Sequence, residues 1–431
     1  MRPLAICRAG NESDMSSVIC LGVGLLVTAS FFDVAGYGAK GNGVANDTLA
    51  IQKAIDAAAA AGGGTVEVRA GTYLTGSLFL KSNVDFHLGA GAVLKGSSNP
   101  KDYNKADVCP QNSASPKSSD NTSGGHLILC VGQSNVMIRG PGRIDGQSDA
   151  FLLDKDGNRY PSKADIPWRP GQMIWFADST DIRIQDLEIA NAPYWSCFLL
   201  NCTRVGIRGC YVHTERRRYH AFNGDGIDVD RCQHVSISDC RIDTSDDCIT
   251  LRASCGKLLK HPQDCAFVTV NNCSLSSACN AVRPGVGEGI VRDCILSGLV
   301  ISNTKTAFNF VAAYSPKSRG PDIQDIQVSD VRLVDTGEFL RMHHMWSSTA
   351  RFRDIAFVGV SGNVREMARI YAHPDSPFEN IRFERCNVNA GVESVNATVR
   401  IDGGTLVEIP LSDADRALRS REIVGHENLL Y

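Results

Sequence analysis

The sequence has little of what marks several large protein classes. Aromatic residues make up only 7% of its 431 residues, charged residues make up 21%, and the formal net charge is −3 at pH 7. Such a chain has no overall basic field to attract nucleic acid, so we expect no nucleic-acid partner. It also has no CxxC pair and no zinc-type cluster of histidines, and we therefore expect neither a metal nor a cofactor.

Long hydrophobic runs are also missing. The most apolar stretch, residues 17–29, is too short for a membrane span, so we expect none. Its length suits the h-region of a secretory signal, although Glu12 and Asp14 offset the preceding positive charges. We treat residues 1–30 as a candidate signal or disordered segment and residues 31–431 as a single domain, expected to be monomeric. A cleaved signal predicts a secreted or periplasmic protein, whereas a mis-assigned start predicts a cytoplasmic one.

Cysteine, by contrast, is abundant, with 16 residues in the chain. Several recur at a spacing of eight, which places them at equivalent points of a repeat rather than in a small disulfide scaffold. Buried thiols stacked in a core explain this spacing, because a free cysteine packs like a compact apolar residue. A few disulfides remain an alternative. The spaced residues are Cys202, Cys210, Cys232, Cys240, Cys248, Cys265 and Cys273.

The fold class follows from short alternating strands that repeat along the chain. Segments such as 180–189, 203–212, 233–242 and 266–275 each combine a polar turn, alternating aliphatic residues, a Gly, Asp or Asn, and another short strand. No helical pattern separates them, which argues against βαβ winding. We predict an all-β fold, a right-handed parallel β-helix, with one helix over residues 49–61 capping its N-terminal end.

The acidic stretch 223–252 is the centre of the functional prediction. Asp225 precedes Asp246 by 21 residues and Asp247 by 22, an interval that equals one turn of a solenoid with about 20–25 residues per turn. The three carboxylates are therefore expected to meet on one wall. Carboxylates that crowd together raise the pKa of at least one of them, which suits the cleavage of a glycosidic bond. A solvated turn and a Ca²⁺ site are the alternatives that the spacing leaves open.

Five motifs in order resemble landmarks of glycoside hydrolase family 28, the polygalacturonase-like, pectin-acting β-helix hydrolases with a pectin-lyase-like solenoid. The resemblance covers roughly residues 32 to 390 and implies inverting hydrolysis, with Asp246 as general acid and Asp225 and Asp247 activating the water. The motifs are GPGRIDGQ at 140–147, RPGQMIWF at 169–176, NAPYWS at 191–196, NGDGIDVDRC at 223–232 and SDDCITLR at 245–252.

The sequence departs from that family pattern in two places. The family's G-H-G is replaced by a segment with Ala278-Cys279, and its basic R-I-K segment reads NTKTAFNF at 303–310. Other residues are available to bind an anionic sugar, because loops beside the acids carry basic side chains. We expect these substrate-binding residues to be Asn223, Arg252, Arg283, His220 and Lys257. The glycines Gly224 and Gly226 are expected to let a sugar approach the backbone closely.

The predicted function is therefore a glycosidase acting on a pectin-like, uronic-acid-containing polysaccharide or oligosaccharide. Two alternatives remain: a polysaccharide lyase on the same fold, which needs Ca²⁺ and a basic residue, and a non-catalytic β-helix that binds carbohydrate at a surface. The insertions at 99–125 and 147–168 interrupt the repeat and are candidates for closing one end of the cleft, which would favour exo over endo attack.

Overall fold

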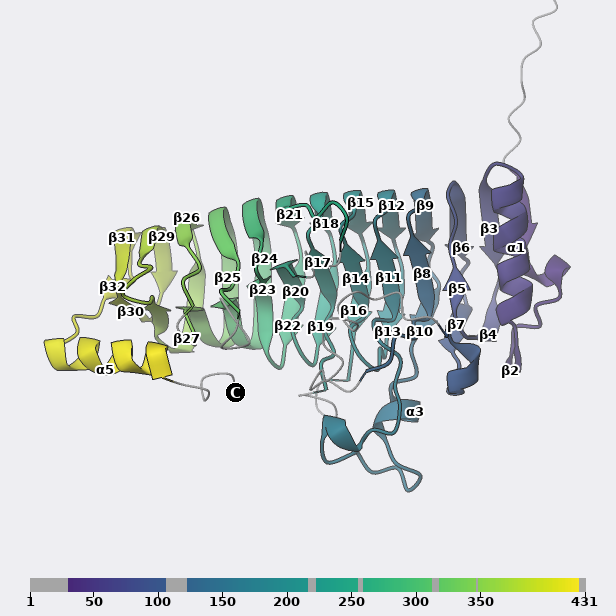
Figure 1. Cartoon of the computed structure of the whole chain (residues 1–431), viewed down its shortest axis with the longest axis horizontal. Coiled ribbons are helices and arrows are strands. Elements are labelled where there is room, and N and C mark those ends of the chain that lie inside the picture. Colours follow the sequence, from purple (N-terminus) through teal and green to yellow (C-terminus); the bar gives the residue numbers. More distant parts are fainter. Residues whose placement is uncertain are drawn as a thin grey trace, which may run out of the picture.

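The computed structural model describes residues 30–105, 122–215, 222–254, 259–311, 318–345 and 348–425. These residues form 32 strands whose ladders are all parallel, each strand pairing with the strand one turn later. Figure 1 shows the result, a long solenoid with its strands stacked along one axis. The predicted parallel β-helix is confirmed.

Three walls run the length of the solenoid, and we call them A, B and C. Two long strands, β24 (Ile290–Val311) and β25 (Asp322–His343), bend through more than one wall. Wall A contains β5 (Leu78–Phe79), β8 (Ile128–Val131), β11 (Ile174–Ala177), β14 (Cys197–Leu200), β17 (Ile227–Asp230), β20 (Ile249–Ala253), β23 (Asn280–Gly287), β28 (Ala368–Tyr371), β30 (Gly391–Val395) and β32 (Val407–Glu408).

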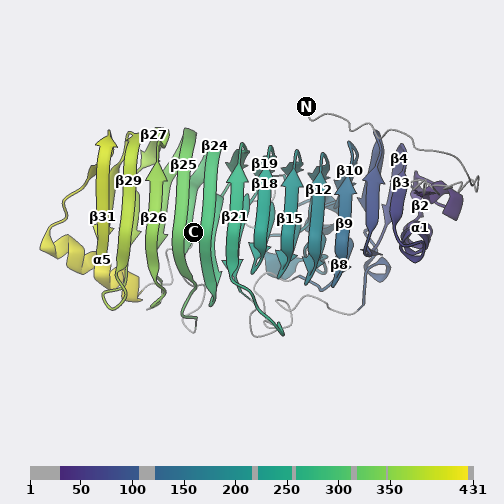
Figure 2. The ribbon, with the colours of Figure 1, turned by 90° about the horizontal axis from the view of Figure 1, so that it is seen from above.

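Wall B, seen in Figure 2, follows chain order along the long axis. It contains β1 (Phe31–Asp33), β3 (Gly64–Val68), β6 (Val84–Leu88), β9 (Ser134–Arg139), β12 (Thr180–Gln185), β15 (Thr203–Arg208), β18 (Gln233–Ser238), β21 (Cys265–Asn271), β26 (Phe352–Val358), β29 (Phe378–Val388) and β31 (Ala397–Gly404). Wall C contains β2 (Asn42–Asn46), β4 (Gly71–Thr75), β7 (Ala92–Gly96), β10 (Arg143–Asp145), β13 (Glu188–Ala190), β16 (Tyr211–His213), β19 (Arg241–Thr244), β22 (Ser274–Ser277) and β27 (Ser361–Glu366).

Left-handed backbone at the corners explains why the repeats carry Asn and Asp. Equivalent positions directly after the wall A strands of successive turns have positive φ, as at Asp178 (48°), Asn201 (52°) and Arg231 (54°). Asn and Asp tolerate this region better than most residues because their short side chains bond locally. The recurring polar residue of each repeat therefore marks the corner between walls A and B.

The interior is a continuous apolar core. At the C-terminal half it is aromatic, with Phe357 stacked on Phe383 at 5.2 Å between ring centroids and Phe308 packed edge-on at 5.8 Å from Phe357. The twelve cysteines among the described residues are all free, and all but Cys279 are buried. The expectation of stacked core thiols is thus confirmed for the described part of the chain.

A helix lies at each end of the solenoid. The predicted capping helix, α1 (Thr48–Ala60), lies over the first turns (Figure 1) and buries Ile51 and Ile55 against the core. At its start the Asn46 side chain accepts a hydrogen bond from the Thr48 amide at 3.0 Å. At the opposite end, α5 (Asp413–Gly425) packs on β28 and β30, an element that the sequence did not predict.

Three short 3-10 helices complete the elements, at η1 (Val34–Tyr37), η2 (Pro100–Asp102) and η3 (Lys163–Asp165). The first one directly follows strand β1. Strand β1 ends at Asp33 because the side chain of that residue accepts a hydrogen bond from the Ala35 amide at 3.0 Å and caps η1. No helix among the described residues is long and apolar enough to cross a membrane.

Candidate active site

The three predicted carboxylates lie on two adjacent turns, at the corner where wall C leads into wall A. The register pairs Ile227 with Ile249, so Asp225 stands one turn from Asp247. Backbone hydrogen bonds join the two corners, from the Gly226 amide to the Asp247 carbonyl at 2.8 Å and from the Asp246 amide to the Gly224 carbonyl at 3.4 Å. The interval of 21 to 22 residues is thus one turn of the solenoid.

Two glycines allow this close stacking of corners. A Cβ on Gly224 would lie 2.2 Å from the Ser245 hydroxyl, and a Cβ on Gly226 would lie 2.4 Å from the Cys248 carbonyl oxygen. Both contacts are with the next turn of the protein. The expectation that these glycines make room for a sugar is therefore wrong, because they make room for the corner that carries Asp246 and Asp247.

Asp247 is held as a buried anion. It is 1% exposed, and its two oxygens accept hydrogen bonds from Asn280 Nδ2 at 2.6 Å and from an Arg283 guanidinium nitrogen at 2.8 Å. Asn309 in turn donates to Asn280 Oδ1 at 3.0 Å. Charge-assisted bonds of this kind are shorter and stronger than neutral ones, so the next two turns fix both the position and the charge of Asp247.

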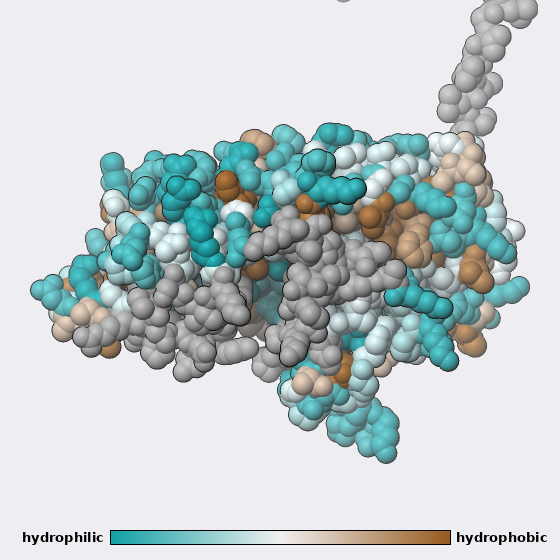
Figure 3. Space-filling view, viewed as in Figure 1, coloured by the Kyte–Doolittle hydropathy of each residue, from teal (hydrophilic) through white to brown (hydrophobic). Residues whose placement is uncertain are grey.

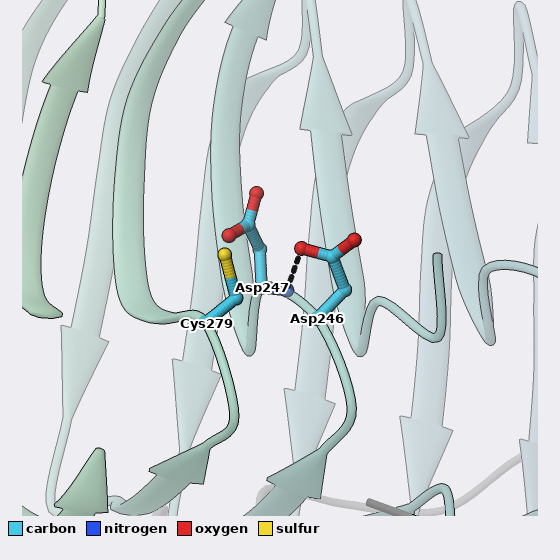
Figure 4. A group of neighbouring side chains, drawn as sticks. All are labelled: Asp246, Asp247 and Cys279. Atoms are coloured by element: carbon cyan, nitrogen blue, oxygen red, sulfur yellow. Dashed lines mark hydrogen bonds between the residues drawn. The ribbon is translucent and has the colours of Figure 1, made fainter. Parts of the chain in front are cut away.

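Asp246 stands beside it in a different environment. It is half-buried, and one of its carboxylate oxygens accepts a hydrogen bond from the Asp247 amide at 3.1 Å. Burial and the neighbouring Asp247 charge raise the pKa of Asp246 to about 7, against the opposing effects of Arg283, Cys279 and Lys163. Figure 4 shows the side chains of Asp246, Asp247 and Cys279 on the same side of the chain.

Asp225 completes the group from the preceding turn. It is 4% exposed, and its Oδ1 has no hydrogen-bond partner among the described residues. Burial raises the pKa of Asp225 well above its ordinary value, and Asp246 is the charged neighbour that raises it most. Carboxylates in such contact cannot all ionise together, so the group keeps at least one proton.

Asn223, expected to orient a substrate hydroxyl, begins the same corner. It is half-buried with a φ of 61°, and its Oδ1 has no partner in the described structure. This amide oxygen lies near Asp225 along the chain and is available to a substrate hydroxyl. The role of Asn223 in orienting such a hydroxyl stays a prediction. His220 and Lys257 lie outside the described residues.

The two arginines expected to bind substrate are committed to the protein. Arg252 is only 6% exposed, stacks on Trp195 at 4.4 Å, and bonds to Asp228 at 3.2 Å. These contacts turn most of Arg252 toward the protein. The Arg283 guanidinium likewise holds Asp247, and substrate binding by either arginine stays a prediction.

Asp228 and Asn280 were not among the predicted site residues. Asp228 is fully buried, accepts a hydrogen bond from Thr250 at 2.5 Å, and has a pKa raised to about 6, chiefly by burial. Its place three residues beyond Asp225 and inside the acidic stretch was a usable signal. The sequence contains no such signal for Asn280. A loop is inserted between Asp247 and Asn280, so their separation along the chain does not equal one regular repeat.

Asp246, Asp247 and Cys279 are also the group among the described residues that has ligand atoms for a metal ion, all within 4.8 Å of one another. Both oxygens of Asp247 are already occupied by Asn280 and Arg283. The positive charge of the Arg283 guanidinium would also repel a metal cation at this place. The expectation that the protein needs no metal stays a prediction.

A polar cavity of about 410 Å³ lies a few turns toward the N-terminus, at the same corner of the solenoid. The carboxylates of the active site do not line it. Its walls are Lys95, Asp145, Gln147, Ser148, Asp149, Ala150, Asn191 and Glu215.

A parallel β-helix that stacks carboxylates of distinct protonation on one corner is a scaffold suited to polysaccharide hydrolysis. Comparison with known proteins points to one family over part of the chain. The sequence profile of glycosyl hydrolases family 28 matches residues 84–266. Over these residues the chain is similar to members of this family.

Individual relatives are distant. The chain is 28% identical over 260 residues to an exo-poly-alpha-D-galacturonosidase of Dickeya chrysanthemi, covering 52% of this chain but only 42% of that protein. It is 24% identical over 378 residues to a probable polygalacturonase of Vitis vinifera, covering 83% of this chain and 74% of that protein. Among solved structures, the exopolygalacturonase of Thermotoga maritima shares the fold with a TM-score of 0.62 at 18% identity, covering 88% of this chain and 92% of that one.

Proposed function

We propose that the protein hydrolyses glycosidic bonds in a pectin-like polysaccharide or oligosaccharide that contains uronic acid, with inversion at the anomeric carbon. Asp246 is the general acid that protonates the leaving oxygen. Asp247 is the base that activates the attacking water, and Asp225 positions that water beside it. The family and the relatives support this class of substrate.

The observation that carries the proposal is the contrast between two neighbouring carboxyls. Burial and the Asp247 charge raise the pKa of Asp246 to about 7, so it holds a proton near neutrality. Asp247 is paired with Arg283 and Asn280, contacts that favour its anionic form. A glycosidase needs two carboxyl groups in different environments, so that at the same pH one is protonated and acts as the acid while the other is ionised and acts as the base.

Each residue then has a defined step. The proton leaves Asp246 for the glycosidic oxygen as the bond to the anomeric carbon breaks. Water attacks that carbon from the opposite face, and its proton passes to the base. The Asp225 oxygen without a partner is available to orient this water.

The test is release of reducing ends from polygalacturonate, rhamnogalacturonan and their short oligomers. Wild-type protein is expected to release them, and Asp246→Asn is expected to lose at least about a hundredfold in kcat, the lower range for general acid catalysis. Substrate binding by the variant should persist. Activity that survives in the variant would refute the role of Asp246.

The same experiment separates the two alternatives. A lyase would form an unsaturated product that absorbs in the ultraviolet and would lose activity with EDTA. A non-catalytic binding module would retain substrate without releasing any reducing ends. Neither result is expected.

A further inference from the structure

The corner that carries Asp246 and Asp247 is held from the two turns that follow it. The register pairs β20 with β23 and β23 with β24, and it sets Asn280 beside Thr306. Residues 303–310 of β24 therefore lie two turns beyond the two carboxyls, about 10 Å along the solenoid at about 4.8 Å per turn. In this segment the sequence departs from the basic R-I-K pattern of the family that it resembles.

A chain of side-chain hydrogen bonds runs from this segment to the base. The Asn309 amide donates to Asn280 Oδ1 at 3.0 Å, and Asn280 Nδ2 donates to an Asp247 oxygen at 2.6 Å. An asparagine side chain has a donor on one side and an acceptor on the other. Because Asn309 engages the oxygen of Asn280, the donor of Asn280 is the group that faces Asp247. A flipped Asn280 would turn its oxygen toward the carboxylate and lose both bonds.

A second chain runs from the same segment to the backbone of the acid. The Ser277 hydroxyl donates to the Asp246 carbonyl at 2.6 Å, and the Ser277 amide donates to Thr304 Oγ1 at 3.1 Å. The Cys279 amide donates to the Ser277 hydroxyl oxygen at 2.8 Å, which leaves the hydroxyl proton for the Asp246 carbonyl. We call this chain the acid relay and the chain through Asn280 the base relay.

The side chains that form both relays are buried. Ser277, Asn280 and Thr304 are at most 2% exposed, and Asn309 is 7% exposed. Inside a protein a polar group that loses its partner stays without one, so such bonds hold their members in place. These side chains act on the reaction through the two carboxyl residues and have little surface to offer a sugar.

The corner of the preceding turn is held by other contacts. The insertion between β10 and β11 contains α3 (Asp149–Leu152) and projects as the lobe at the bottom of Figure 1 and Figure 3. Its apolar side packs on Phe222, three residues before Asp225. Apolar packing from an earlier turn thus holds the Asp225 corner, whereas hydrogen bonds from later turns hold the acid and the base.

We infer that Thr304 and Asn309 of β24 are positioning residues, which place the acid and the base through the two relays. The inference rests on the proposed function. Both relays begin on one strand, so a single element sets the placement of the two carboxyls relative to each other. An inverting glycosidase needs a separation between its acid and its base that admits a water. A disturbed relay should therefore slow the chemical step and leave substrate binding unchanged.

The first test compares Asn309→Leu with Thr306→Val. Leucine has nearly the size of asparagine, and it removes an Asn309 oxygen that has no partner among the described residues, so the fold should tolerate the change. We expect kcat to fall about three- to tenfold, the loss of one neutral hydrogen bond, and KM to change by less than about twofold. Thr306 is a matched control, because it is buried in the same segment and lies outside both relays. Thr306→Val should match wild type.

Thermal unfolding checks that both variants keep the fold. A kcat of Asn309→Leu within about twofold of Thr306→Val would overturn the base relay. A rise in KM at unchanged kcat would overturn it as well, because that result assigns Asn309 to substrate binding. Absence of reducing ends from the wild-type protein would instead contradict the proposed function, and the inference would fall with it.

A double-mutant cycle tests the path from Asn309 to Asp247. Asn280→Leu removes the 2.6 Å bond to Asp247 and should lower kcat about tenfold or more. In that background Asn309 no longer has an amide to hold, so adding Asn309→Leu should change kcat by less than about twofold. An added loss as large as in the wild-type background would overturn the path through Asn280.

The acid relay is tested with Thr304→Val, again with Thr306→Val as the matched control. Thr304→Val removes the acceptor of the Ser277 amide and should lower kcat about threefold or more with little change in KM. If this variant does not fold, Ser277→Ala removes the bond to the Asp246 carbonyl itself and should show the same loss. Wild-type kcat in either folded variant would overturn the acid relay.

Discussion

Replacement of Arg283 by Gln tests how the base is held. The guanidinium lies 2.8 Å from an Asp247 oxygen in a position where that carboxylate is 1% exposed. A hydrogen bond to a charged group contributes about 1.5–3 kcal/mol, which corresponds to roughly a 10- to 150-fold loss of kcat if the anionic base depends on it. The second bond, from Asn280 at 2.6 Å, remains and limits the loss.

A second readout comes from the acid. Arg283 lowers the Asp246 pKa, so its removal raises that pKa and the alkaline limb of the kcat profile should move to higher pH. The assay is reducing-end release at several pH values, with thermal unfolding to verify the fold. Arg292→Gln is a matched control, because Arg292 pairs with Asp264 at 3.0 Å on another face of the solenoid. A kcat for Arg283→Gln within about twofold of wild type would refute the reasoning.

Three further predictions follow from the same structure. For wild type, kcat should fall as the pH rises through about 7, where Asp246 loses its proton; a flat profile across that range would contradict the assignment. Gly224→Ala places a Cβ 2.2 Å from the Ser245 hydroxyl and should cost about 1–3 kcal/mol in the free energy of unfolding, whereas Gly206→Ala, with nothing within 4 Å, should unfold like wild type in a denaturant titration. Phe357→Ala opens the aromatic core stack and should cost about 3–5 kcal/mol, a loss that urea unfolding would show as a lower midpoint.

The solenoid was predictable because its cause is local and repeated. Each turn needs a left-handed corner, and the chain supplies Asp178, Asn201 or their equivalents at regular positions. The one-turn interval between Asp225 and Asp247 follows from the same repeat. Stacked cysteines were predictable for a similar reason, since a residue at a fixed phase of the repeat always faces the core.

What the sequence did not show depends on contacts between turns separated by loops of irregular length. Arg283 looked free to bind substrate because its distance along the chain from Asp247 says nothing about the 2.8 Å bond between them. The insertion between β10 and β11 has no repeat, so only the packing of its Phe151, Leu152 and Ile166 on Phe222 places it beside the site. The burial of Arg252 under Trp195 had no sequence signal either.

The most direct test of the account is the anomeric configuration of the first product, followed by NMR during early hydrolysis of a uronide oligomer. A single displacement, with Asp246 giving its proton and an activated water attacking the far face, predicts a product of inverted configuration. A product that keeps the configuration of the substrate would show a covalent intermediate and would contradict the roles assigned to Asp225 and Asp247.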